Sequence, residues 1–393
     1  MKIFIGFIVF NIAIVWSFAH VDHIIYNNYR NREFSGKIYK ELAKDHLGNF
    51  VGSPMSLELI LCLLFDGARS HTADQIAHAL VLHHNRTSID ALIEPVIKEL
   101  QNQPDVVTLD LVNKIYVTND LRLANDFTNT ALNVFHTDVA TIDFRKPDHT
   151  MHVVNKWISE ETDHHITDVL SESDVNSNTK AVLVNALNFK ATWLKRFSKH
   201  HTKKANFFID ERHIVPVDML ETTENLMYYE DFNLRAKFLE IPYHGHSLSM
   251  VVVLPERKYG LPHLEKHINE VLHTELYSLN NVHVKIPKFK TESVIDYVPV
   301  LEELGVADLF TPSANLDGIA GVGSGLHVNK IIQKNSIGVH ENGTVSDSAA
   351  VSDLASSTGS SYPQVEFVAD HPFIYYVKSA VGVLFVGRYA GHE

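Results

Sequence analysis

The spacing of hydrophobic residues predicts mostly helices in the first half of the chain. Apolar residues recur there every three or four positions, as they do on the buried face of a helix. Ser53-Pro54 is typical of a helix start, because serine caps the first turn and proline fits its first position. Thr72-x-x-Gln75 fits a capping box, which is another start signal. The predicted helices cover residues 34–48, 53–67, 72–82, 88–102 and 148–169.

The second half of the chain is richer in strand patterns, with short runs of β-branched and aromatic residues between turn signals. The predicted strands are Ala181–Phe189, Lys237–Pro242, Leu248–Leu254, Val282–Phe289, Ile331–His340, Phe373–Val377 and Val383–Arg388, with an earlier one at Val106–Val117. Residues 343–362, between two of these strands, are almost entirely small or polar. Long segments of this kind are usually flexible surface loops, and they often carry function.

The composition is that of a globular protein and argues against nucleic acid as a partner. Of the 393 residues, 45% are hydrophobic and 21% are charged, and the formal net charge is −13. Phosphate binding needs a basic footprint, and only residues 195–204 form a dense basic run. That run is either a solvated loop or a polyanion site, and the charge pattern leaves both open.

The N-terminal segment indicates export. Residues 1–19 combine Lys2, an apolar stretch and a small-residue cleavage pattern, which is typical of a signal peptide cut after Ala19. A signal anchor is the alternative, but the apolar stretch is short for one, and no later stretch approaches the ~20 apolar residues of a membrane span. We therefore expect a secreted, extracellular protein with no membrane partner. Asn85 and Asn342 lie in glycosylation sequons.

The residues that usually carry catalysis or bind metals show no recognisable motif. Cys62 is the only cysteine and lies in an apolar run, so we expect a buried thiol and no internal disulfide. The 25 histidines suggest a metal site or a pH switch, but doublets such as His83-His84 point to different faces of a helix. HExxH, GxSxG, P-loop and CxxC patterns do not occur in the sequence. We expect neither an enzyme nor a metal or other cofactor.

Several short motifs along the mature chain resemble those of the serpin family. They are Asn49–Ser56, Val184–Trp193, Leu239–Tyr243, Ile286–Phe289, Glu341–Thr344, and Asp370–Phe373 with Leu384–Arg388, in the family's order. Length alone would allow two domains. The resemblance instead implies a single α+β domain at residues 20–393, with three β-sheets and about nine helices. It also implies an exposed reactive loop at about residues 343–365.

Inhibitory serpins use this loop to trap a protease. The protease cleaves the loop to an acyl-enzyme, and the loop then inserts as an extra strand into the central sheet. The resemblance assigns a hinge (Glu341, Gly343, Thr344, Ser346, Ser348, Ala350), a shutter (Ser53, Ser56, Asn185, Gln333), an ion pair (Lys288, Glu341) and a reactive bond (Ser357–Thr358). Some members do not inhibit, so a carrier, storage or interaction protein is the alternative function.

The loop sequence is compatible with insertion as a strand. Side chains alternate between the two faces of a strand, so positions in step with Thr344 would face the interior. These positions carry no charge, whereas Asp347 and Asp353 fall on the opposite face, which we expect to be the solvent side. Ser346 and Ser348 stand where inhibitory members usually have alanine, and a buried hydroxyl without a partner costs ~1–3 kcal/mol. A solvated tether is the alternative interpretation of this segment.

The loop also restricts the class of target protease. It contains no Lys or Arg between Gly343 and Tyr362, whereas a trypsin-like pocket needs a cation for its buried carboxylate. Small residues at 355–357 suit an elastase-like, subtilisin-like or cysteine protease, and Leu354 and Tyr362 are rival cleavage points for a chymotrypsin-like one. Residues 88–102 carry a single base, so we expect no strong heparin binding. We also expect a monomer.

Overall fold

The structure is a computed structural model. It describes residues 24–82, 89–101, 107–162, 164, 166–276, 278–344 and 364–391, together with the helical backbone of residues 2–23. The helices are α1 (Lys2–Asp45), α2 (Pro54–Gly67), α3 (Ser70–Ala79), α4 (Ile89–Gln101), α5 (Asn125–Asn133), α6 (Pro147–Glu161), α7 (Leu261–Lys266), α8 (Ile268–His273), α9 (Tyr297–Glu303) and α10 (Asp317–Ala320). Short 3₁₀ helices lie at η1 (Glu172–Asp174), η2 (Lys199–His201) and η3 (Asp308–Phe310).

The strands form three sheets, as the family resemblance implies. They are β1 (Phe50–Gly52), β2 (Val107–Thr118), β3 (Asp138–Ile142), β4 (Ala181–Ala191), β5 (Lys203–Phe208), β6 (Ile214–Asp231), β7 (Ala236–Pro242), β8 (Ser249–Pro255), β9 (Leu279–Pro287), β10 (Phe289–Asp296), β11 (Lys330–Val339), β12 (Gln364–Val368), β13 (Phe373–Ser379) and β14 (Gly382–Tyr389). The central sheet has the order β10-β11-β4-β2-β3. The other nine strands are also joined by hydrogen bonds, eight of them in the order β1-β14-β13-β8-β7-β6-β9-β12 with β5 paired to β6, and they divide into two sheets at β6. The first part of β6 pairs with β5 and β9, and its last residues pair with β7.

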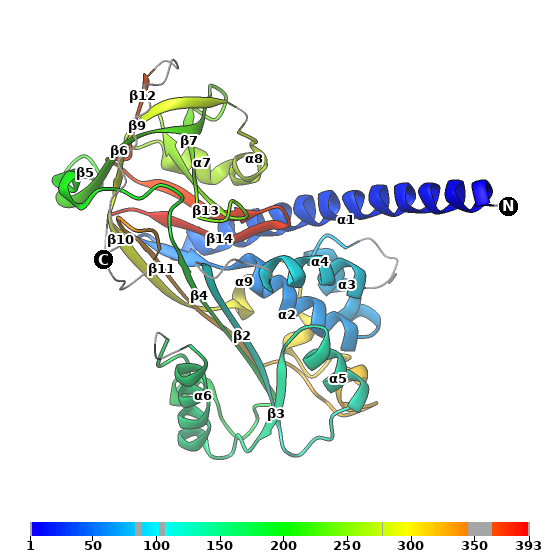
Figure 1. Cartoon of the computed structure of the whole chain (residues 1–393). Helices are drawn as coiled ribbons and strands as arrows, with labels where there is room; N and C mark the ends of the chain where they lie inside the picture. The colour runs from blue at the N-terminus through cyan, green and yellow to red at the C-terminus, as the bar shows by residue number, and fades with distance from the viewer. Residues whose placement is uncertain are drawn as a thin grey trace.

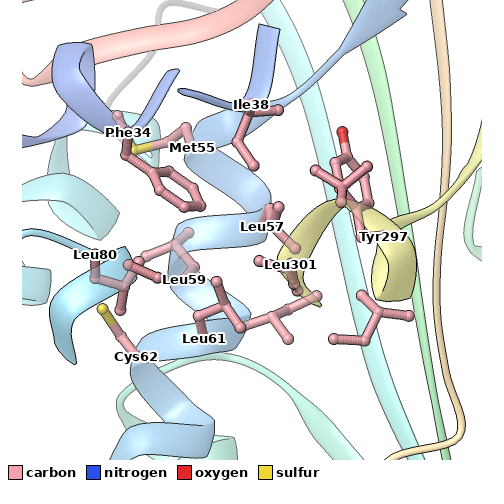
Figure 2. Packing of buried hydrophobic residues seen from close by; sticks show 14 of the residues in the cluster. Phe34, Ile38, Met55, Leu57, Leu59, Leu61, Cys62, Leu80, Tyr297 and Leu301 are labelled. Carbon is pink, nitrogen blue, oxygen red and sulfur yellow. The ribbon is translucent and has the colours of Figure 1, made fainter. Parts of the chain in front are cut away.

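Helix α2 is buried on all sides and forms the centre of the main hydrophobic core (Figure 2). Its residues are mostly apolar on every face rather than on one face only, which is typical of a helix enclosed by other elements. Cys62 lies on this helix, is 1% exposed, and forms no disulfide, as predicted. Burial raises the pKa of its thiol to about 12, so the thiol stays protonated and unreactive at neutral pH.

Helix α6 covers one face of the central sheet, here called the outer face (Figure 1). Val154 and Ile158 of α6 form a hydrophobic cluster with Val182 and Val184 of β4. The opposite, inner face of β4 packs on the two larger cores through residues such as Leu183 and Phe189. Both faces of β4 are therefore buried over much of its length.

The first part of α1 projects away from the domain (Figure 1).

Most predicted elements are confirmed, but one cap and several boundaries are wrong. Helix α1 spans Lys2–Asp45, so it begins far before the predicted residues 34–48. Helix α3 begins at Ser70 without a side-chain cap, because the Thr72 hydroxyl accepts a hydrogen bond from the backbone N–H of Asn315 instead. Helix α6 ends at Glu161 rather than near residue 169, and the Thr162 hydroxyl, which donates to the Ile158 carbonyl and accepts from the Ile166 N–H, holds the chain in a turn after the helix.

The predicted strand Val282–Phe289 is in fact parts of two strands. The chain leaves one sheet at Pro287, the last residue of β9, and joins the central sheet at Phe289, the first residue of β10. Proline has no N–H to continue a ladder, so this position suits a strand end.

Candidate functional site

The central sheet is open at one end between β4 and β11. These parallel strands pair from Lys330–Val182 to Ser336–Asn188, and the ladder stops there. Both strands continue for three more residues, to Ala191 in β4 and Val339 in β11. Over these residues each strand pairs with its outer neighbour, β2 or β10, but the two do not pair with each other. We call this β4–β11 boundary the seam.

The predicted hinge residues Gly343 and Thr344 lie at the open end of the seam. Gly343 forms antiparallel bridges with Thr192 and His340. The Thr344 N–H donates to the Ala191 carbonyl at 2.7 Å, and the Ala191 N–H donates to the Thr344 hydroxyl at 3.0 Å. Thr344 is 2% exposed, so its side chain is already inside the domain.

Gly343 is required at this turn for two independent reasons. Its φ of +143° is a conformation that other residues rarely adopt. A Cβ atom at this position would also lie 2.0 Å from the carbonyl oxygen of Ala191. Any side chain here would therefore push the chain away from β4.

Glu341 and Lys288 form the predicted ion pair beside the hinge. Lys288 Nζ lies 3.0 Å from Glu341 Oε2, and the Thr202 hydroxyl donates to Glu341 Oε1 at 3.0 Å. Burial opposes ionisation of the Glu341 carboxyl, but hydrogen bonds from its own backbone N–H, Lys288 and Thr202 outweigh burial. The pKa of Glu341 therefore lies below its ordinary value, and the carboxylate is charged at neutral pH.

We expect Lys288→Met to lower the stability of the intact protein at pH 7 by about 1 kcal/mol, because Lys288 is half exposed and solvent screens the pair. The folded-state pKa of Glu341 is depressed, so its contribution is complete above the unfolded-state pKa and disappears as the pH falls through the folded-state pKa. The urea midpoints of variant and wild type should therefore differ at pH 7 and converge at an acid pH below the folded-state pKa of Glu341. Lys290→Met, which removes an exposed pair with Glu292, is the control and should change little. A constant difference at both pH values would contradict the assignment.

The four predicted shutter residues lie together in one buried network beneath the seam. Gln333 on β11 and Asn185 on β4 are register partners across the seam. The Gln333 side chain accepts from the Ser53 N–H at 2.9 Å and donates to the Ser53 carbonyl at 3.1 Å. The Asn185 amide donates to the Ser56 hydroxyl, and the Ser53 hydroxyl caps α2 by accepting from the Ser56 N–H. The start of α2 is thus bonded to both strands that flank the seam.

Three further polar residues complete this network and were not predicted. The Tyr297 hydroxyl and the Asn335 amide both donate to Gln333 Oε1, at 2.9 and 2.6 Å. Asn113 on β2 accepts from the Asn185 amide. Asn113 and Asn335 are 5% and 0% exposed and occupy inward-facing strand positions. A polar residue at a position where a strand usually carries an apolar one was the signal available in the sequence.

The remaining predicted site residues cannot be placed in the same way. Asn85, Ser346, Ser348, Ala350, Ser357 and Thr358 lie outside the described residues. Asn342 is described, and its backbone carbonyl accepts from the Trp193 N–H at 2.9 Å. Among the described residues, no group of three or more His, Cys, Asp or Glu side chains is arranged to hold a metal ion. Within the same part of the chain, no helix has the length and apolar character of a membrane span.

Comparisons with known proteins agree with this architecture. A family profile described as serpin (serine protease inhibitor) matches residues 29–391. Leukocyte elastase inhibitor of Bos taurus is 31% identical over 371 residues, which cover 91% of this chain and 97% of that protein. Serine protease inhibitor 42Dd of Drosophila melanogaster is 30% identical, with 90% and 94% covered. The crystal structure of Serpin48, a highly specific serpin of the insect Tenebrio molitor, matches with a TM-score of 0.87 at 34% identity, with 94% and 98% covered.

The described part of the chain forms a three-sheet α+β domain, and the Serpin48 structure matches this fold over 94% of the chain. The chain belongs to the serpin family. The description of the family is that of protease inhibitors rather than enzymes, and both of these curated relatives carry inhibitor names.

Proposed function

We propose that this chain is a secreted suicide-substrate inhibitor of an extracellular protease. The protease nucleophile attacks the carbonyl of Ser357, an acyl bond to the enzyme forms, and the peptide bond to Thr358 breaks with release of its amine. The segment from Thr344 to the cleaved end then enters the seam between β4 and β11. The attached protease is carried along, and its active site is distorted before water can hydrolyse the acyl bond.

The position of Thr344 supports this proposal most directly. Its N–H donates to the Ala191 carbonyl as in an antiparallel ladder, and its side-chain hydroxyl accepts from the Ala191 N–H in the place that a ladder carbonyl would take. The next residues of the loop could extend this ladder only by separating β4 from β11, which pair over seven residues of each strand. The network that bonds α2 to both strands lies directly below the seam, so the same side chains would have to part during insertion.

The bridge between Gly343 and Thr192 suggests the register of the inserted strand. If the loop continued antiparallel to β4 in this register, Ser346 would lie opposite Phe189 and Asp353 opposite Val182. Phe189 belongs to the inner face of β4, whereas Val182 belongs to the outer face. The acids would thus avoid the inner core. Asp353 would lie beside Lys330, the β11 partner of Val182.

At this level the outer face of the sheet is not exposed to solvent, contrary to the expectation from the sequence. Val182 and Val184 are 0% exposed because α6 covers them. Full insertion would therefore require α6 to shift so that Asp353 can reach water or Lys330. We infer that α6 moves during the inhibitory reaction.

Secretion is part of the proposal and rests on the sequence of residues 1–19. Protein expressed in a eukaryotic secretory host should appear in the medium with His20 as its first residue. Mass spectrometry of the intact N-terminus measures this. Retention of residues 1–19 on membrane-bound protein would favour the signal-anchor alternative.

The proposed function predicts a covalent complex with a protease of narrow or apolar specificity. We expect an SDS-stable band with an elastase-like, subtilisin-like or chymotrypsin-like protease, and none with trypsin, because the loop lacks Lys and Arg. Mass spectrometry of the released peptide should place the cut at Ser357–Thr358. The same protease with its nucleophile replaced by alanine is the control and should give no covalent band.

Two results would overturn parts of this proposal. A fast, stoichiometric complex with trypsin would refute the target class. Cleavage of the loop by every protease tested, with no covalent complex, would refute inhibition and favour a carrier, storage or interaction role.

A further inference from the structure

A groove of about 570 Å³ lies between α6 and the strands β2 and β3, on the outer face of the central sheet. This volume is in the range of sites that bind small molecules. We call it the α6 groove. The lining side chains that matter for its chemistry are Lys114, Tyr116, His149, His152, Lys156 and Trp157.

The floor of the α6 groove is aromatic and carries a cation. The rings of Tyr116 and Trp157 meet edge to face, with centroids 6.2 Å apart. Lys114 Nζ lies 5.0 Å from the centroid of Trp157 and 5.5 Å from that of Tyr116. Trp157 and Val153 are partly exposed in the groove, so a flat apolar molecule could cover them. Such an arrangement suits a ligand with an aromatic body next to a negative charge.

The hydroxyl of Tyr116 is a buried hydrogen-bond donor that the fold does not use. Tyr116 is 2% exposed, and its Oη has no hydrogen-bond partner among the described residues. Burial raises the pKa of this phenol, and the Asp138 carboxylate raises it further, so the hydroxyl keeps its proton at physiological pH. A buried polar group without a partner costs ~1–3 kcal/mol, and native proteins rarely retain one without a reason.

Donors outnumber acceptors among the side chains that face the α6 groove. Lys114, Lys156, His149 and His152 can all donate, against the carboxylates of Asp138 and Glu160. Asp138 pairs with Lys114 at 2.6 Å, and Glu160 pairs with Lys156 at 3.7 Å. Both carboxylates are more than half exposed, whereas the Lys114 side chain is 14% exposed. The Asp138 carboxylate can therefore turn into water, and an incoming anion could take its place as the partner that the largely buried Lys114 charge needs.

We propose that the α6 groove binds a small amphipathic anion, with an aromatic body over Trp157 and a carboxylate or sulfonate at Lys114 and the Tyr116 hydroxyl. The consequence for the reaction rests on the proposed function. Because α6 must shift for full insertion of the loop, a ligand wedged between α6 and β2 would hold it in place. Bound ligand should therefore slow insertion and divert the protein from covalent complex to cleaved product.

The binding itself can be tested without a protease. The probe is 8-anilinonaphthalene-1-sulfonate, titrated into the full mature protein and followed by its fluorescence and by quenching of tryptophan. We expect saturable binding of one molecule per chain. Lys114→Met and, separately, Trp157→Leu should each weaken binding at least tenfold, while Lys146→Met, outside the groove at the start of α6, should leave it unchanged. Circular dichroism and the thermal midpoint check that each variant is folded.

A second probe isolates the role of the charge. N-phenyl-1-naphthylamine has the same aromatic body without the sulfonate, and it should bind at least tenfold more weakly. Equal affinity for the two probes would overturn the anion assignment, and unchanged affinity in both groove variants would overturn the site. If the probe binds as expected but leaves the ratio of covalent complex to cleaved product unchanged, the site stands and its effect on α6 is refuted. If the protein inhibits no protease, the proposed function fails while the binding result is unaffected.

Discussion

Protein nicked within residues 354–362 should unfold about 20 °C above the intact protein. Insertion of the loop from Val345 to Leu354 would add about ten residues of ladder to the central sheet, at about 1 kcal/mol for each hydrogen bond. A gain of that size corresponds to roughly 2 °C per kcal/mol in a domain of this length. A protease that is not trapped can make the nick, mass spectrometry locates it, and circular dichroism measures the midpoint.

The gain in stability must come from insertion and not from the cut alone. The control for this prediction is the Thr344→Arg protein nicked at the same bond, which should keep the thermal unfolding midpoint of its intact form. An unchanged midpoint in the nicked wild type would mean that the seam does not accept the loop. The alternative function as a carrier, storage or interaction protein would then be favoured.

The second large effect is expected from Thr344→Arg, which should abolish inhibition while the loop is still cleaved. Thr344 is 2% exposed at the first inward position, so in the intact variant residue 344 would withdraw from Ala191 to keep the arginine in solvent, and insertion would force the charge into the inner face of the sheet. Burying an unpaired charge costs several kcal/mol, so insertion should become slower than hydrolysis of the acyl bond. The fraction of protein that ends in covalent complex should fall at least tenfold, as measured by gel densitometry after complete reaction.

The position of the arginine, rather than its charge, should determine this effect. Val345→Arg is the matched control, because alternation places residue 345 on the outer face. It should retain most of the covalent complex, and Thr344→Ser should do so as well, since serine keeps the hydroxyl that bonds to Ala191. Undiminished complex formation by Thr344→Arg would refute the hinge assignment.

The elements that flank the seam could be predicted from the sequence because their signals are local. Ser53-Pro54 starts α2 as expected, since capping and proline preference depend only on neighbouring residues. Strands β4 and β11 lie close to their predicted bounds, because runs of β-branched residues favour strands. Strand β6 was missed, since it serves two sheets in turn and its exposure does not alternate over its 18 residues.

The sequence by itself determined the serpin motifs, the absence of basic residues from the loop, and the small residues in step with Thr344. Only the tertiary structure decided where the ladder between β4 and β11 stops, and that Thr344 already bonds to Ala191 there. It also brought Asn113, Tyr297 and Asn335 into the network below the seam. The physical reason is that strand pairing and buried polar contacts join residues far apart along the chain, whereas caps and alternation act between near neighbours.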